Sequence, residues 1–102
     1  MTTNTILGQH KFDGPYSTVG ELFQRSGVYI ISTALRDGSH KIIDVGESGN
    51  VQTRVSSHDR AASWNQYAVN GLYASAHYCD EFARMILEQA VRTAYKPSCG
   101  ER

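Results

Sequence analysis

The sequence has little cysteine, no excess charge of either sign and no long apolar run. Its two cysteines, Cys79 and Cys99, match neither a zinc-binding spacing nor a redox pair, so we expect two reduced thiols. The polar start, residues 1–14, lacks the apolar core of a signal peptide, and no segment reaches the length of a membrane-spanning helix. The sequence therefore predicts a cytoplasmic protein with no membrane partner.

The charge balance weighs against strong electrostatic binding of nucleic acid. Ten Lys and Arg residues are matched by ten Asp and Glu residues, which gives a formal net charge of zero at pH 7. A nucleic-acid-binding protein usually has an excess of positive charge that neutralises phosphates. A neutral chain with such a partner must collect its basic residues on one face. The 102 residues are enough for one domain, and a hydrophobic fraction of 40% is typical of a globular one.

The first 26 residues predict an N-terminal arm with one short helix. They are polar at first and are interrupted by Gly14 and Pro15, which break any periodic pattern. Thr18 and Glu21 have the spacing of a capping box, which indicates a short helix that ends near Gly27. We therefore expect the folded domain to cover residues 27–102.

The sequence of residues 27–102 predicts three strands and three helices. The strand segments are rich in β-branched and aromatic residues or alternate between apolar and polar positions. The helical segments have good capping residues and apolar positions at helical spacing. The order predicts an α/β (α+β) fold, with a small three-stranded mixed or antiparallel sheet flanked by helices. The expected strands are residues 27–33, 41–46 and 71–79, and the expected helices are residues 51–58, 59–67 and 81–96.

Several short motifs occur in order along this predicted domain. Arg54 follows Gly46 by eight residues, and His58 follows Arg54 by four. The full set is Gly27-Val28-Tyr29 at the start of the first strand, Asp44-Val45-Gly46 at the end of the second, Arg54 with His58 in the first helix, and Glu88 in the last helix, nine residues before Pro97.

In this ordered set the sequence resembles the GIY-YIG nuclease superfamily, from about Gly27 to Gly100. Gly27-Val28-Tyr29 stands where that family has Gly-Ile-Tyr, and Asp44-Val45-Gly46 stands where it has Tyr-Ile-Gly. Asp44 thus replaces the tyrosine of the second motif. Gly100 replaces the asparagine that usually follows the proline by three residues.

The resemblance implies a metal-dependent endonuclease that hydrolyses phosphodiester bonds of nucleic acid, with DNA favoured over RNA. Glu88 would then bind one Mg²⁺ or Mn²⁺, because Mg²⁺ is usually held by one or two carboxylates together with water and substrate phosphate. Arg54 would hold the scissile phosphate with its guanidinium group. His58 would accept a proton or orient water, and Tyr29 would position or activate the nucleophile.

Each of these residues also has a structural interpretation. Glu88 and Arg54 could be solvated helix residues, His58 could be a structural histidine, and Tyr29 a cross-strand aromatic. Trp64 and Tyr67 could stack on bases, although core packing is the better interpretation of Trp64.

Asp44 is the least expected residue of the set. Aspartate is a poor strand former, and a buried carboxylate needs a cation or a metal. We expect Asp44 to contact Arg54 or His58, or to act as a second metal ligand. Gly46 and Gly49 flank a predicted helix start, a weak phosphate-binding pattern that tight turns explain equally well.

Two other functions fit the same sequence. One is a catalytically impaired module that keeps the fold for nucleic-acid binding or protein interaction, suggested by Asp44, Gly100 and the zero net charge. The other is a small-ligand enzyme, which would need an apolar pocket. No segment reads as a separate DNA-recognition domain, so a nuclease of this size would rely on a separate DNA-targeting protein or on a homodimer.

Overall fold

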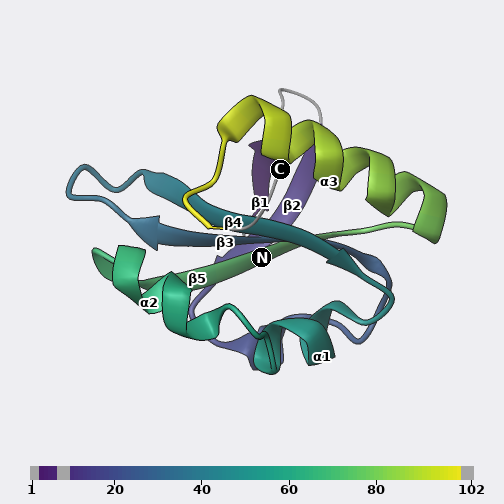
Figure 1. Ribbon diagram of the computed structural model, residues 1–102, viewed down its shortest axis with the longest axis horizontal. Coiled ribbons are helices and arrows are strands. Elements are labelled where there is room, and N and C mark those ends of the chain that lie inside the picture. Colours follow the sequence, from purple (N-terminus) through teal and green to yellow (C-terminus); the bar gives the residue numbers. More distant parts are fainter. Residues whose placement is uncertain (1–2, 7–9, 100–102) are drawn as a thin grey trace.

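The computed structural model describes residues 3–6 and 10–99 and forms one antiparallel sheet with helices on both faces (Figure 1). The five strands lie in the order β1-β2-β5-β3-β4, and every neighbouring pair is antiparallel. The predicted α+β class is confirmed, whereas the predicted number of three strands is too small. The strands are β1 (Thr3–Ile6), β2 (His10–Tyr16), β3 (Gly27–Ala34), β4 (His40–Ser48) and β5 (Asn70–Tyr78). The helices are the 3₁₀ turn η1 (Val19–Glu21), α1 (Val51–Ser56), α2 (Ala61–Tyr67) and α3 (Glu81–Tyr95).

The N-terminal segment corrects the expectation of an arm. Strand β2 pairs with β5, and the side chain of Phe12 is fully buried in the core. Gly14 and Pro15 do not end the strand, because they lie where its register against β5 shifts, and glycine is typical of such bulges. The sheet therefore extends across the expected boundary between residues 26 and 27. The expected short helix is only the single turn η1, and Thr18 makes no side-chain cap there.

Strand β3 lies inside the sheet and separates two cores. Residues 27–33 are all buried, and their side chains alternate between the faces. Val28 and Ile30 pack in the cluster under α3, whereas Tyr29 and Ile31 pack in the cluster against α1 and α2. Figure 1 shows α3 on one side of the sheet and α1 and α2 on the other.

The helix ends follow their capping residues. The Asn50 side chain accepts from Thr53 N at the start of α1, and the Asp80 side chain accepts from Ala83 N at the start of α3. Helix α3 ends at Tyr95, two residues before the predicted stop at Pro97. Helix α1 ends at Ser56, earlier than predicted, so His58 lies in the connection to α2.

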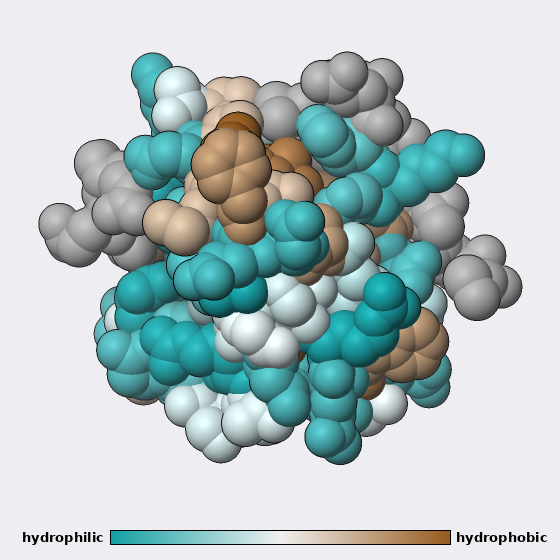
Figure 2. Space-filling model, turned by 90° about the vertical axis from the view of Figure 1, so that its right-hand side faces the viewer, coloured by the Kyte–Doolittle hydropathy of each residue, from teal (hydrophilic) through white to brown (hydrophobic). Residues whose placement is uncertain are grey.

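The outer surface of α3 has several exposed apolar side chains. Phe82, Met85 and Ile86 are all more than half exposed. In Figure 2 hydrophobic residues gather in the upper part of the molecule, where α3 lies, above a largely hydrophilic surface. Within the described residues, no helix has the length and apolar character needed to cross a membrane. Cys79 and Cys99 are free thiols, as predicted.

Candidate active site

A small cavity beside β4 brings together residues from both faces of the sheet. Because β4 is an edge strand, residues of the helices on the two faces can meet next to it. The cavity has a volume of about 200 Å³ and is lined by four of the predicted site residues, Tyr29, Gly46, Arg54 and Glu88. These residues come from β3, β4, α1 and α3, respectively. The other lining residues are Val45, Glu47, Arg60 and Arg92.

Tyr29 and His58 form a buried pair at this cavity. The distance between Tyr29 Oη and His58 Nε2 is 2.7 Å, and the His58 side chain is fully buried. The backbone N–H of Arg60 donates to His58 Nδ1 over 3.0 Å, so in a neutral imidazole the proton lies on Nε2. His58 then donates to Tyr29, and the hydroxyl proton of Tyr29 remains available to a ligand. Asp59 Oδ1 also lies 3.2 Å from Nδ1, but the Asp59 side chain is 73% exposed, whereas a backbone N–H can only donate.

The local environment keeps both side chains neutral near pH 7. Burial raises the pKa of Tyr29 to about 12, against the opposing effect of the Arg54 charge. Burial, followed by the charges of Arg54 and Arg60, lowers the pKa of His58. In this geometry Tyr29 is a hydrogen-bond donor toward the cavity and His58 holds it in place. His58 is not one turn after Arg54 on a helix, as predicted, because α1 has already ended.

Asp44 is fully buried, but its partners differ from those expected. We expected Arg54 or His58, and the structure instead places two other guanidinium groups around the carboxylate. Arg60 Nε donates to Oδ2 over 2.9 Å, and Arg92 Nη2 donates to Oδ1 over 3.2 Å. Trp64 Nε1 donates to Oδ2 over 2.8 Å. Burial of the carboxylate is therefore compensated by charge and by hydrogen bonds, as such burial requires.

A β-bulge precedes Asp44 in the sheet. Ile31 pairs with Asp44, but the next residue, Ser32, pairs with Ile42, so Ile43 is the extra residue. Bulges redirect the side chains that follow them and are common beside functional sites. Directly after the bulge, the carboxylate of Asp44 lies between Arg60, at the start of α2, and Arg92, on α3.

Glu88 is a buried, ion-paired residue rather than a solvated helix residue. Its side chain is 9% exposed, and Arg92 Nε donates to its Oε2 over 3.0 Å. Among residues 3–6 and 10–99, no group of three or more His, Cys, Asp or Glu side chains could hold a metal ion. One or two carboxylates with water and substrate phosphate suffice for Mg²⁺, and Glu88 and Glu47 both line the cavity. Both carboxylates are ion-paired, Glu88 with Arg92 and Glu47 with Arg84, so a magnesium ion would share each of them with an arginine and take its other ligands from water and substrate.

Gly46 packs against Tyr29, whereas Gly49 does not contact the site. A Cβ atom at position 46 would lie 2.2 Å from Tyr29 Oη, and a Cβ atom at position 49 would meet no atom within 4 Å. Glycine at position 46 thus leaves room for the Tyr29 ring beside the cavity. A role of either glycine in binding the substrate stays a prediction.

This difference gives a matched pair of substitutions. We expect Gly46→Ala to lower the free energy of unfolding by about 1–3 kcal/mol, because the added methyl group overpacks the buried Tyr29. We expect Gly49→Ala to change it by less than about 0.5 kcal/mol. Urea denaturation followed by circular dichroism measures both values. Equal effects of the two substitutions would contradict the contact between Gly46 and Tyr29.

Arg60 and Arg92 are the main site residues that sequence reasoning missed. Asp44 in an interior strand signals that a cation must lie nearby, but the chain has ten Lys and Arg residues and gives no means of choosing among them. Trp64 is buried and bonded to Asp44, so it is not available for base stacking, whereas Tyr67 is 44% exposed. Gly100, where the family has an asparagine, lies outside the described residues.

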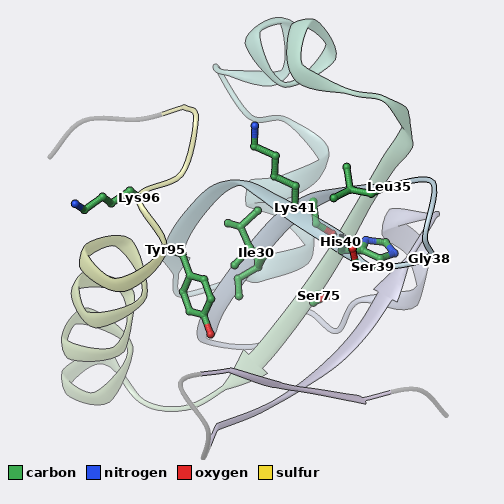
Figure 3. A pocket seen from close by; sticks show the side chains of 11 residues that line it. Ile30, Leu35, Gly38, Ser39, His40, Lys41, Ser75, Tyr95 and Lys96 are labelled. Carbon is green, nitrogen blue, oxygen red and sulfur yellow. Dashed lines mark hydrogen bonds between the residues drawn. The ribbon is translucent and has the colours of Figure 1, made fainter.

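A larger cavity of about 650 Å³ lies under the α3 face of the sheet, between the β3–β4 turn and the end of α3 (Figure 3). It contains none of the predicted site residues. Ser32 and His40 form a hydrogen bond of 3.0 Å there, but no carboxylate lies among its described lining residues to orient the imidazole. Figure 3 shows Lys96 extended away from the other lining side chains. The chemistry is therefore concentrated in the smaller cavity beside β4.

Comparisons of the chain with protein-family models, curated proteins and solved structures found no match. The arrangement of the side chains beside β4 is thus the basis for a functional assignment. It combines a tyrosine hydroxyl, two arginines that are partly exposed and a buried glutamate in one cavity. Such a set can neutralise and orient a phosphate group.

Proposed function

We propose that the protein is a metal-dependent endonuclease that hydrolyses phosphodiester bonds of nucleic acid, with DNA as the favoured substrate. One observation carries the proposal. Tyr29, Gly46, Arg54 and Glu88 come from four separate elements and line the same cavity. These are residues that the resemblance to the GIY-YIG superfamily selects. Tyr29 and Gly46 are paired across the β3–β4 hairpin, whereas Arg54 and Glu88 reach the cavity from helices on opposite faces of the sheet.

Each side chain has a role that its environment supports. Arg54, whose side chain is 40% exposed, binds the non-bridging oxygens of the phosphate. Tyr29 donates its hydroxyl proton toward the attacking water or the phosphate, and His58 orients that hydroxyl group. Water attacks phosphorus and loses a proton to the solvent, the P–O bond to one sugar oxygen breaks, and that oxygen takes up a proton. The products are a phosphate monoester and a hydroxyl group at a nick or strand break.

Glu88 is the residue that would hold Mg²⁺ or Mn²⁺, and Glu47 lines the same cavity. The ion, when bound, neutralises the negative charge that develops on the phosphate oxygens. We place the activity in the cytoplasm. A separate DNA-targeting protein or a second copy of the chain would supply the recognition of particular sites.

The ion pair between Glu88 and Arg92 favours a second candidate function. Arg92 lies 3.0 Å from the carboxylate that would bind the metal, so its charge competes with a metal ion for Glu88. A module that binds phosphate groups of nucleic acid without cutting them would have such a neutralised glutamate. The two functions differ in whether the folded protein cleaves its ligand.

A cleavage time course tests the proposal. The purified protein is incubated with labelled single-stranded, double-stranded and branched DNA and with RNA, in Mg²⁺, Mn²⁺ or EDTA. We expect metal-dependent cleavage that falls at least about 100-fold in Glu88→Gln, because charge neutralisation at the phosphate is lost. Glu81→Gln, on the same helix but 77% exposed, is the matched control and should cleave at the normal rate.

Two outcomes would contradict the proposal. The absence of cleavage on every substrate, by protein that circular dichroism shows to be folded, would favour the binding module. Equal cleavage by the Glu88→Gln and Glu81→Gln proteins would show that Glu88 is not needed or that a contaminating nuclease is present.

A further inference from the structure

We propose that Arg60 is a second phosphate-binding residue beside Arg54, that Asp44 is its positioning residue, and that the two arginines bind a phosphate group without a divalent metal. The inference rests on the proposed function, because it assigns the ligand of the same cavity. It adds a residue that no motif of the sequence selected. It also gives Asp44, the unexpected residue of the second motif, a specific task.

The guanidinium group of Arg60 is held along one edge only. Its Nε donates to Asp44 Oδ2 over 2.9 Å, and its Nη2 donates to Asp44 Oδ1 over 3.3 Å. A guanidinium group has five N–H bonds, so this contact leaves three for another ligand. Arg60 lines the cavity with a side chain that is 32% exposed, and no further acceptor of its side chain occurs in the described part of the chain. The second edge can therefore bind two phosphate oxygens at once.

Asp44 cannot turn away from Arg60 without losing other contacts. Its side chain is 0% exposed, and it also accepts from Trp64 Nε1 over 2.8 Å and from Val45 N over 2.8 Å. Arg92 Nη2 adds a fourth partner at 3.2 Å. The carboxylate is thus fixed in the protein interior, and it holds Arg60 in one orientation before any ligand arrives. Such preorganisation reduces the entropy lost on binding.

The charges around the cavity leave the two arginines as its available cations. Arg92 donates to Glu88, to Asp44 and to two backbone carbonyl groups, so its N–H groups are largely used within the protein. Arg54 pairs with Asp59, but the Asp59 side chain is 73% exposed, and water and salt screen such an exposed ion pair strongly. A phosphate group can therefore replace Asp59 as the partner of Arg54.

The size of the cavity agrees with a ligand of this kind. Its volume is about 200 Å³. One water molecule takes about 30 Å³ in the liquid, so there is room for one phosphate group and several waters. The shared chemistry is a phosphate group with at least two free oxygens. Its source can be the backbone of nucleic acid or a free phosphate, and the experiment below separates them.

Binding is measured with the whole chain in EDTA at low salt. Fluorescence anisotropy reports binding of labelled single-stranded and double-stranded DNA, and inorganic phosphate and pyrophosphate are added as competitors. Competition at submillimolar phosphate would identify a free phosphate as the preferred source, and its absence would identify the nucleic-acid backbone. The variants are Arg60→Gln, Arg60→Lys, Asp44→Asn and the double variant Asp44→Asn/Arg60→Gln. Arg36→Gln, in the exposed β3–β4 turn, is the matched control for the loss of one positive charge.

We expect DNA to bind in EDTA and Arg60→Gln to raise the Kd about tenfold or more, whereas Arg36→Gln changes it less than about twofold. The plot of log K against log salt should become shallower by about one in Arg60→Gln. Arg60→Lys keeps the charge but cannot bind two oxygens in the same geometry, so it should restore the affinity only in part. Asp44→Asn should weaken binding, and the double variant should bind no more weakly than Arg60→Gln, because Asp44 acts through Arg60.

Failure of this inference can be told apart from failure of the proposed function. Equal Kd values for Arg60→Gln and Arg36→Gln, or no binding by the folded wild-type protein in EDTA, would overturn the inference even if the protein cleaves DNA with metal. Binding that depends on Arg60, without cleavage in any metal, would support the inference and contradict the nuclease. If Asp44→Asn does not fold, the two Arg60 variants and the salt dependence still decide the role of Arg60.

Discussion

Replacing Asp44 by alanine should lower the free energy of unfolding by about 3–5 kcal/mol, because it removes one of the two carboxylates paired with the buried Arg92. Arg92 is 7% exposed, and within the described part of the chain its carboxylate partners are Asp44 and Glu88. The substitution also removes the acceptor of the buried Trp64 Nε1–H. A domain of this size is stable by only about 5–15 kcal/mol, so the loss is a large part of the total.

Urea denaturation followed by circular dichroism measures this loss. Trp64 fluorescence is unsuitable as the only probe, because the substitution changes the environment of its indole ring. The matched control is Asp59→Ala, which removes the exposed partner of Arg54 and should leave the urea concentration at the unfolding midpoint nearly unchanged. If the two alanine variants unfold at the same urea concentration, Asp44 does not hold the buried cluster together.

The second large effect is expected on cleavage. Tyr29→Phe removes the hydroxyl group that lines the cavity, and we expect the cleavage rate to fall by about 10²–10³-fold, the range for a lost hydrogen-bond donor to the reacting group. The same change leaves the buried Nε2–H of His58 without its acceptor. The free energy of unfolding should therefore also fall, by about 1–3 kcal/mol.

The rate of cleavage is measured with the protein well below its unfolding transition, so that the two effects stay separate. Tyr67→Phe is the matched control, since Tyr67 is 44% exposed and lies on α2, outside the lining of the cavity. It should leave both the rate and the stability unchanged. A Tyr29→Phe protein that cleaves at the rate of the Tyr67→Phe protein would remove Tyr29 from the mechanism.

The sequence predicted the elements that have strong local signals. The hairpin of β3 and β4 and the starts of α1, α2 and α3 all lie close to their expected positions. Strand β2 was missed because Gly14 and Pro15 look like the end of a strand, and only the pairing with β5 shows that they lie at a bulge. The early end of α1 was also missed. Ser56 Oγ donates to the carbonyl group of Thr53, a local bond that competes with a longer helix.

The candidate site was predicted less completely than the fold. Spacing selected Tyr29, Arg54 and Glu88, which the structure brings to one cavity. The partners of Asp44 could not be selected, because Arg60 follows it by 16 residues and Arg92 by 48. Contacts of that kind depend on how the edge strand meets helices on both faces of the sheet, and no local pattern records this.

The buried cluster also constrains how this sequence can change over generations. Asp44 occupies the position of a tyrosine in the motif that the sequence resembles, and Arg92 depends on its carboxylate. An uncharged residue at position 44 would leave Arg92 with Glu88 as its remaining carboxylate partner and would remove the acceptor of Arg60 and Trp64, in a domain with little stability to lose. We therefore expect sequences that share this buried cluster to keep Asp44 and Arg92 together.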